Sequence, residues 1–456
     1  MLDDTIIAIS TPPGYGGIGI VRLSGRRSLS IAKKIFRPRR KNWRDIGPRV
    51  CILGDLFDNE RNELVDEAYL SYFPAPRSYT KENVVEISCH GSPVVLEETV
   101  RLGVRAGARP AHPGEFTLRA YFRGRIDIIQ AEAVNDLITA VSLQQAKISL
   151  GQLRGGLSRH IDSLRSQVID LISLLEAGIE FPEENLGISP GETARRLESV
   201  LRAVERLIAS HETGRAMTEG LNLAIVGRTN VGKSTLFNAL LEHERAIVSP
   251  YPGTTRDYLR ERIKIKDSFF HLIDMAGLER PAHPVERDAI RRSRKLASRA
   301  DGILLVLDGS RRESPADLRL IEKFRNKKMI ILFNKADLPA KIDRRKCRGG
   351  SPFSRAIAVS ALKGTNIPRL KNAILATFVP KQDGQEEVIL HMRQRLLFEQ
   401  IASALEKALK RLREGYSEEV CAEEVRRALP LLGQLTGEVR VDEVMANIFS
   451  RFCVGK

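Results

Sequence analysis

The sequence predicts a multidomain α+β and α/β protein in which a doubly wound, mostly parallel α/β domain is inserted into a discontinuous all-helical domain. Residues 216–378 alternate short apolar runs with helical patterns, as a doubly wound parallel sheet requires. Helical periodicity flanks this stretch, in residues 119–215 and 379–456. Residues 1–118 show strand and turn patterns that predict a separate N-terminal α/β domain. Because domain termini tend to lie close together, one interrupted helical domain is the simplest arrangement.

Size and composition are those of a globular protein with several domains. The 456 residues exceed what one core usually holds, and 42% hydrophobic with 29% charged residues is typical of soluble chains. Apolar runs such as 302–307 are too short to span a bilayer. The first residues, Met1-Leu-Asp-Asp4, are acidic where a signal peptide would be basic. We therefore expect a cytoplasmic protein with no membrane partner.

Charge and cysteine usage narrow the function classes. The five cysteines are scattered without a C-x-x-C pair, which indicates neither a disulfide framework nor a zinc site. A net charge of +16 favours a polyanionic partner such as RNA. Basic clusters occur at 37–41 and 344–348 without interleaved aromatic residues. Each cluster fits ordinary solvated surface charge as well as it fits RNA contact.

In the N-terminal domain, the segments Thr5–Ser10 and Gly17–Leu23 are predicted strands joined by a turn, and Val84–Ser88 is a third. The glycines of 14–19 fit a structural hairpin better than a ligand loop. The helical domain shows apolar residues at i, i+3, i+4 and i+7, which predict core faces. These faces are Val134, Leu137, Ile138 and Val141; then Ile161, Leu164, Val168, Leu171, Ile172 and Leu175; and Leu397, Ile401, Leu405, Ala408, Leu409 and Leu412.

The segment Gly227–Ser234 fits the pattern G-x-x-x-x-G-K-[ST] between a predicted strand, Leu221–Val226, and a predicted helix, Thr235–Leu241. That context is the one a P-loop requires, because backbone N–H groups and the helix N-terminus then point at one phosphate chain. Lys233 would reach the β- and γ-phosphates, and Ser234 would bind Mg²⁺. The candidate nucleotide-binding residues of this segment are Asn230, Gly232, Lys233, Ser234 and Thr235.

Four further motifs follow in the order that a Ras-like GTPase domain needs. Thr255 would complete the Mg²⁺ shell, Asp274 would hold the ion through water, and the Gly277 N–H would sense the γ-phosphate. The other two motifs each follow a predicted strand and supply Asn334, Lys335 and Asp337, and then Ser360 and Ala361. A carboxylate at Asp337 accepts the N1–H and 2-amino groups of guanine. Adenine lacks both donors, so the sequence predicts GTP rather than ATP.

The residue that follows Asp274-Met-Ala-Gly277 bears on hydrolysis. Ras-like GTPases have a glutamine there to orient the attacking water, whereas this chain has Leu278, which cannot do so. Another polar group must act, or hydrolysis is very slow. Glu279 and Glu286 are the candidates, and the residues alone leave the choice open.

Over nearly its whole length the chain resembles the MnmE (TrmE) family of tRNA-modification GTPases. Besides the nucleotide-binding motifs, the resemblance is carried by Thr11-Pro-Pro-Gly14, Pro113-Gly-Glu-Phe-Thr-Leu-Arg-Ala120, Gln130-Ala-Glu-Ala133, Phe181-Pro-Glu-Glu184 and Phe452-Cys-Val-Gly-Lys456. It implies a homodimer formed through the N-terminal domains, and a flavoprotein partner, MnmG, in a heterotetramer. The family adds an aminomethyl or carboxymethylaminomethyl group to C5 of the wobble uridine (U34) of certain tRNAs. A 5-formyl-tetrahydrofolate or related derivative would supply the one-carbon unit.

The resemblance also assigns residues. It implies a potassium-stimulated GTPase with Glu286 as the water-orienting group, and Cys453 as a candidate for covalent chemistry whose thiol pKa Lys456 would lower. The K⁺ ligands it implies are Asn230, Ser249, Tyr251 and Thr254, and the folate-binding residues are Arg22, Glu86, Arg125 and Lys456. The alternative is a regulatory GTPase that binds RNA without modifying it. The 452–456 segment and the folate-site matches favour the modification enzyme.

Overall fold

The computed structural model describes residues 4–39, 43, 47–140, 142–180, 190–218, 220–241, 260–266, 268–274, 300–347, 354–379, 388–439, 442–450, 452 and 454–455. The chain divides into two compact units. The first comprises residues 1–138, 150–173 and 425–456, and the second comprises 139–149 and 174–424. The predicted boundaries near residues 118, 215 and 378 stay predictions.

The first unit contains a seven-stranded sheet in the order β3-β4-β5-β6-β2-β1-β7. Its strands are β1 (Ile6–Ile9), β2 (Gly16–Ser24), β3 (Phe36–Pro38), β4 (Cys51–Asp58), β5 (Glu63–Phe73), β6 (Val84–Gly91) and β7 (Arg109–Pro110). The helices α1 (Ser28–Ile35) and α2 (Pro93–Arg105) pack against it through one apolar cluster. The predicted pairing of the first two strands and the strand at β6 are confirmed.

A network of three arginines and three carboxylates links helix α3 (Glu115–Phe122) to this sheet. Arg119 is fully buried, and its Nη2 donates to Asp4 Oδ1 at 2.5 Å and to Glu115 Oε1 at 2.9 Å. Its Nη1 donates to Glu82 Oε2 at 3.2 Å. Arg109 also pairs with Asp4 and Glu115, and Arg123 pairs with Glu82. Part of the motif at 113–120 therefore has a structural role.

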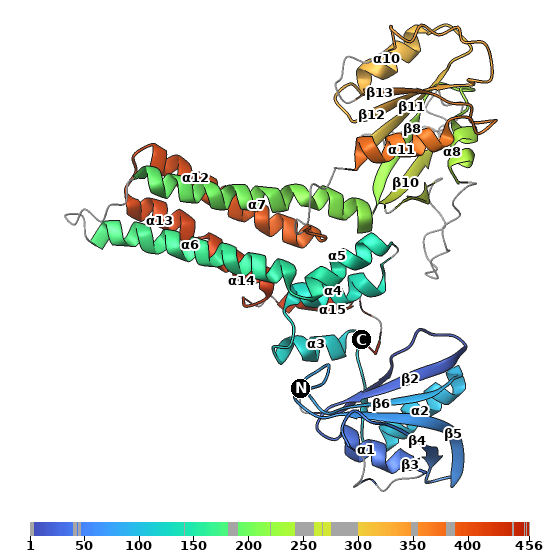
Figure 1. Ribbon diagram of the computed structural model, residues 1–456, viewed down its shortest axis with the longest axis vertical. Helices are drawn as coiled ribbons and strands as arrows, with labels where there is room; N and C mark the ends of the chain where they lie inside the picture. Colours follow the sequence, from blue (N-terminus) through green and yellow to red (C-terminus); the bar gives the residue numbers. More distant parts are fainter. Residues whose placement is uncertain are drawn as a thin grey trace, which may run out of the picture. The chain divides into compact units, whose positions relative to one another are not determined.

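Helices precede and follow the second sheet in sequence. They are α4 (Ile128–Ile138), α5 (Leu143–Leu153), α6 (Gly156–Glu180), α7 (Pro190–Thr218), α12 (Met392–Arg413), α13 (Glu418–Arg426), α14 (Ala428–Thr436) and α15 (Asp442–Ser450). In the first unit α4 packs against α3 and α14, and in the second α7 lies along α12 (Figure 1). The predicted apolar face of α6 is buried throughout.

One predicted core position on α4 is wrong. Ile138 is 47% exposed, because it is the last residue of the helix. The buried side chains of α4 lie earlier in the helix, at positions such as Ile128 and Ala131. Val141 lies outside the described residues.

The second unit contains a six-stranded sheet in the order β13-β12-β11-β8-β10-β9. Only β9 is antiparallel to its neighbour, which confirms the predicted doubly wound, mostly parallel fold. Its elements are β8 (Leu221–Val226), α8 (Lys233–Leu241), β9 (Arg260–Ile265), β10 (Ser268–Asp274), β11 (Gly302–Asp308), α10 (Pro315–Lys323), β12 (Met329–Asn334), β13 (Ser354–Ala358) and α11 (Ile367–Phe378). One apolar cluster holds α8 and α11, and another holds α10.

The central strands read as continuous apolar runs because both faces of this sheet are covered. Their carboxyl ends meet at one edge, which is where open α/β sheets bind ligands. Within the described part of the chain, every helix is too short or too polar to cross a membrane.

Candidate functional site

The segment Gly227–Ser234 turns the chain from the end of β8 into α8. A Cβ on Gly232, whose φ is +93°, would lie 2.2 Å from Asn334 Nδ2. A Cβ on Gly227 would lie 2.4 Å from the Val306 carbonyl oxygen. Glycine is required at both positions, because the loop is pressed against the ends of β11 and β12. Asn230 has a φ of 61°, a left-handed conformation that asparagine tolerates better than most residues.

Lys233, the first residue of α8, is buried. Its Nζ donates to the carbonyl oxygens of Gly227 at 3.0 Å and Arg228 at 2.7 Å, which holds the cation over the loop. Ser234 and Thr235 are exposed beside it. The loop therefore presents a cation, a hydroxyl and a helix N-terminus together, a combination that suits a phosphate chain and its Mg²⁺.

Asn334 joins the P-loop to the segment that begins at Ser360. Its Nδ2 donates to the Val231 carbonyl at 2.8 Å, and its Oδ1 accepts from the Ala361 N–H at 3.0 Å. The side chain is buried at the end of β12. In this structure Asn334 thus fixes the spacing between the two loops that would hold the phosphates and the base.

Asp337 is the residue that was predicted from the sequence to select the base. Its Oδ1 accepts a hydrogen bond from Ser360 Oγ at 2.5 Å, while Ser360 Oγ accepts from the Lys363 N–H at 3.2 Å. The hydrogen bond from Ser360 lowers the pKa of Asp337, so the carboxylate is ionised at neutral pH. Because Asp337 is exposed, this oriented carboxylate is accessible to a ligand.

Asp308, at the end of β11, was missed by the sequence analysis. Its Oδ2 accepts from Lys335 Nζ at 2.7 Å, and its Oδ1 accepts from Ser310 Oγ at 2.6 Å. Burial alone would raise the pKa of Asp308, but the hydrogen bonds from Lys335 and Ser310 outweigh it and lower the pKa. The pair fixes Lys335 beside Asp337. Its only sequence signal was a carboxylate directly after the apolar run at 302–307.

Several predicted residues lie outside the described residues. They are Ser249, Tyr251, Thr254, Thr255, Gly277, Glu279 and Glu286, together with Cys453 and Lys456. The backbone of Asp274 pairs with Ile225 at the end of β8, so this residue reaches the same sheet edge as the P-loop. Among the residues that the structure does describe, no group of three His, Cys, Asp or Glu side chains forms a metal site.

The first unit brings together three of the four predicted folate-binding residues. Arg22 of β2 and Glu86 of β6 are cross-strand partners, with Arg22 Nε 2.8 Å from Glu86 Oε1. The Tyr79 ring lies near both arginines, with its centroid 5.7 Å from Arg22 Cζ and 4.9 Å from Arg125 Cζ. Arg125 Nη1 also donates to the Tyr79 carbonyl at 2.7 Å. Tyr79 was not among the residues predicted from the sequence.

The segment Val454–Gly455 reaches this cluster. Val454 forms a β-bridge with Pro113, and the Gly455 carbonyl accepts from Ser10 Oγ at 3.1 Å and Arg22 Nη1 at 3.5 Å. A Cβ on Gly455 would lie 2.0 Å from the Ile9 carbonyl oxygen, and its φ is +96°. Only glycine fits at this position, which explains on steric grounds why one residue of the 452–456 motif is a glycine.

Two arginines of the basic cluster at 37–41 are engaged within the protein. Arg39 pairs with Asp55 at 2.7 Å and with Glu67, and Arg37 lies over the Phe57 ring at 3.4 Å from its centroid. These contacts favour the interpretation of this cluster as ordinary surface charge.

The second sheet and its P-loop, with an exposed, ionised carboxylate at the same edge, define a P-loop GTPase. Comparison of the whole chain with known protein families gives a more specific assignment. Residues 5–125 match the family described as the GTP-binding protein TrmE N-terminus, and residues 128–453 match the MnmE helical domain. The chain belongs to the MnmE family, which confirms the resemblance drawn from its motifs.

Curated relatives match along their full length. The tRNA modification GTPase MnmE of Aquifex aeolicus (strain VF5) is 40% identical over 455 residues, which cover 99% of this chain and 100% of the relative. The protein of the same name from Moorella thermoacetica is 40% identical over 463 residues, which cover 100% of both chains. A crystal structure of a single-residue variant of Aquifex aeolicus Era bound to GDP.AlF4- is 26% identical, covers 40% of this chain and 66% of its own, and has a TM-score of only 0.29.

Proposed function

We propose that this chain hydrolyses GTP and couples hydrolysis to modification of the wobble uridine of certain tRNAs, together with a flavoprotein partner of the MnmG type. The observation that carries the GTPase assignment is the exposed carboxylate of Asp337, oriented by Ser360 at the same sheet edge as Lys233. The tRNA assignment is supported by the family to which the chain belongs. We place the reaction in the cytoplasm.

The proposed roles of the individual residues follow the charge that each can offer. Lys233 would contact the β- and γ-phosphates, and the Ser234 hydroxyl would bind Mg²⁺ with Thr255 and Asp274. Mg²⁺ would neutralise charge on the phosphates. Asn334, Lys335, Asp337, Ser360 and Ala361 would hold the base, the Gly277 N–H would sense the γ-phosphate, and Glu286 would orient the water. Cys453 remains a candidate for covalent chemistry.

A second part of the proposal is a folate-type site at Arg22, Glu86, Arg125 and Lys456. Cations suit the glutamyl carboxylates of a folate, and a carboxylate suits its amino-pterin edge. The side chains of Arg22 and Glu86 are 17% and 25% exposed, so a ligand can reach their ion pair. The Tyr79 ring adds a flat apolar face. We infer a homodimer formed through the N-terminal domains, each carrying one such site.

Potassium is expected to accelerate GTP hydrolysis roughly tenfold or more over sodium, because a cation beside the phosphates neutralises developing charge. The proposed ligands are Asn230, Ser249, Tyr251 and Thr254. Replacement of Asn230 by alanine should abolish the preference for K⁺ while nucleotide binding persists. Steady-state rates in matched KCl and NaCl, over a range of protein concentrations, provide the measurement.

The control variant is Asn238→Ala, which changes an exposed asparagine on α8 and should keep the potassium preference. Equal wild-type rates in both salts would refute the potassium site. A rate that rises with protein concentration only in KCl would support pairing of two nucleotide-binding domains.

Mass spectrometry of tRNA nucleosides from a deletion strain tests the proposed function. Loss of the C5 modification at the wobble uridine, with recovery on re-expression, is the expected result. Unchanged wobble uridines would instead favour the regulatory GTPase, which binds RNA and modifies nothing. GTP hydrolysis alone does not separate the two, because both classes hydrolyse GTP.

A further inference from the structure

Two loops of the second unit, residues 309–314 and 341–347, are held side by side. The Gly309 carbonyl accepts from the Lys341 N–H at 3.0 Å, and the Asp343 N–H donates to Glu313 Oε2 at 3.1 Å. Both loops leave the sheet near its carboxyl edge, because the first follows β11 and the second follows shortly after β12. These two hydrogen bonds hold the loops next to each other, so that their side chains form one continuous surface.

The two loops carry six cationic and two anionic side chains, a net charge of +4. We call this the cationic loop surface, formed by Arg311, Arg312, Lys341, Arg344, Arg345 and Lys346. All six residues are exposed. Of the two carboxylates, Glu313 is only 11% exposed and pairs with Lys346 at 3.1 Å. The positive charge therefore faces solvent while the main compensating charge does not.

Several of these cations have no carboxylate partner among the residues that the structure describes. Within the described residues, no carboxylate pairs with Arg312, Lys341 or Arg345. The ion pair of Arg311 with Asp308 is long, at 3.8 Å between Nε and Oδ2, and the arginine side chain is 82% exposed. The oxygens of Asp308 already accept hydrogen bonds from Lys335 and Ser310. Arg312 is moreover close enough to Lys346 to oppose the rise in the pKa of Lys346 that Glu313 causes. Unpaired like charges side by side are unfavourable without an external anion.

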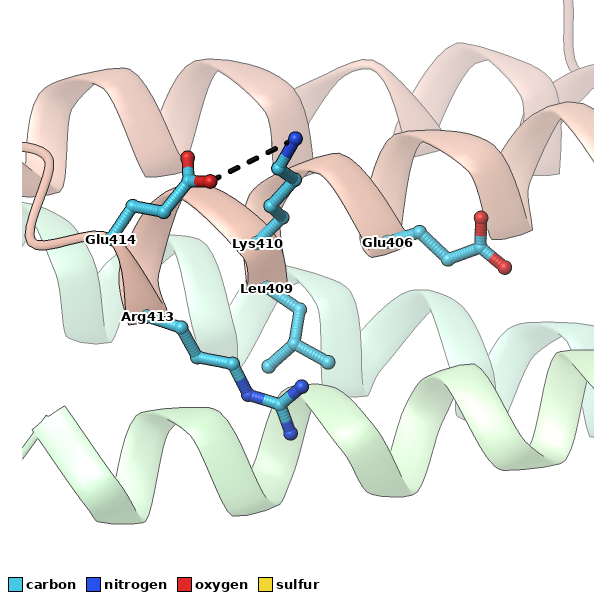
Figure 2. Close-up of a pocket in the computed structure, with 5 residues that line it drawn as sticks. All are labelled: Glu406, Leu409, Lys410, Arg413 and Glu414. Atoms are coloured by element: carbon cyan, nitrogen blue, oxygen red, sulfur yellow. Dashed lines mark ion pairs between the residues drawn. The ribbon is translucent and has the colours of Figure 1, made fainter.

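The charged groove on α12 differs from the cationic loop surface, because its lining holds two cations, Lys410 and Arg413, and two carboxylates, Glu406 and Glu414 (Figure 2). There Lys410 pairs with Glu414 at 3.7 Å, and Arg413 pairs with Glu198 at 2.6 Å. Both cations of the groove are therefore paired with carboxylates. Unlike the two loops, this groove carries no excess of positive charge.

We propose that the cationic loop surface binds the phosphate backbone of tRNA, beside the base-recognition end of the nucleotide site. This inference rests on the proposed function, which supplies tRNA as the polyanion. Six exposed cations without interleaved aromatic residues suit phosphates rather than stacked bases. Contact there would place RNA next to Lys335 and Asp337, two residues that we propose hold the guanine.

The test compares two double variants of the full-length protein. Arg312→Gln/Arg345→Gln removes two cations from the surface, and Arg355→Gln/Arg369→Gln removes two exposed arginines from β13 and α11. The probe is a fluorescently labelled tRNA transcript with a wobble uridine, measured by anisotropy over a range of KCl concentrations. We expect the first variant to bind roughly tenfold more weakly, with a salt slope reduced by about 1.5, because each phosphate contact releases counterions. The second variant should match the wild type.

The outcomes separate this inference from the proposed function. GTP hydrolysis without tRNA should be the same in all three proteins, which shows that the variants are folded. If both double variants bind tRNA as tightly as the wild type does, the surface assignment is overturned while the proposed function stands. If the first variant loses the flavoprotein partner but keeps tRNA, the surface contacts protein and the inference is also overturned. Failure of the wild type to bind tRNA at low salt would count against both.

Discussion

Replacement of Asp337 by asparagine is expected to weaken GTP binding by roughly 10²- to 10³-fold and to create affinity for XTP. The carboxylate would accept the N1–H and 2-amino groups of guanine, and an asparagine presents one amide donor instead. That donor matches the 2-oxo group of xanthine. The hydrogen bond from Ser360 Oγ at 2.5 Å can be kept by the asparagine oxygen, so the side chain should stay oriented. Titration with fluorescent guanine and xanthine nucleotides measures both effects.

A neighbouring substitution is a matched control. Asp343→Asn changes an exposed carboxylate of the same domain that accepts from the Arg345 N–H at 2.9 Å, and it should leave both affinities unchanged. If Asp337→Asn binds GTP as tightly as the wild type, the base is recognised elsewhere. Equal losses for both variants would indicate a general charge effect.

Replacement of Arg119 by methionine is expected to lower the free energy of unfolding by about 3 kcal/mol, because removing one member of a buried ion network leaves uncompensated charge. The guanidinium is fully buried and bonds to Asp4, Glu82 and Glu115. Arg109 and Arg123 still neutralise part of this charge, which places the loss at the lower end of the usual range. Denaturant unfolding monitored by circular dichroism gives the value.

An exposed ion pair provides the comparison. Arg101→Met breaks the contact of Arg101 with Glu98 at 3.1 Å, where the arginine side chain is 61% exposed, and it should change stability little. A stability of Arg119→Met equal to or above that of the wild type would show that the network contributes nothing net.

The same network predicts a dependence on pH. Burial alone would raise the pKa of Glu115, but hydrogen bonds from Arg109, the His112 amide and Arg119 bring it below the ordinary value of 4.5. A lowered carboxyl pKa stabilises the fold above pH 4.5 and loses that contribution as the pH falls further. The wild type should therefore lose stability in acid more steeply than Arg119→Met. Parallel curves would contradict this account.

Contiguous motifs were predictable from the sequence. The P-loop, Asn334, Asp337 and Ser360 each lie in a short segment at or just after the end of an apolar strand, and parallel strands bring such segments to one edge. The structure places them there. Buried helical faces such as that of α6 were equally predictable, because helical periodicity reports burial directly.

The missed residues depend on pairings between distant segments. Asp308 matters because β11 lies next to β12 in the sheet, and Tyr79 matters because it packs near Arg22 of β2. Neither relation leaves a periodic signal. The prediction that Ile138 is buried was wrong for a related reason. An apolar residue at the end of a helix fits the periodic pattern even where no neighbouring element packs over it.

The contact between Arg22 and the Gly455 carbonyl imposes an order on the making of this protein. The two residues are separated by 433 positions, so the ribosome must translate everything between them before the pair can meet. During synthesis the N-terminal sheet can fold before the Gly455 carbonyl is present, so Arg22, which lies near the Tyr79 ring, lacks this hydrogen-bond acceptor. The proposed folate site is therefore incomplete in a nascent chain, and a ligand that needs this carbonyl can bind only after translation has reached residue 455.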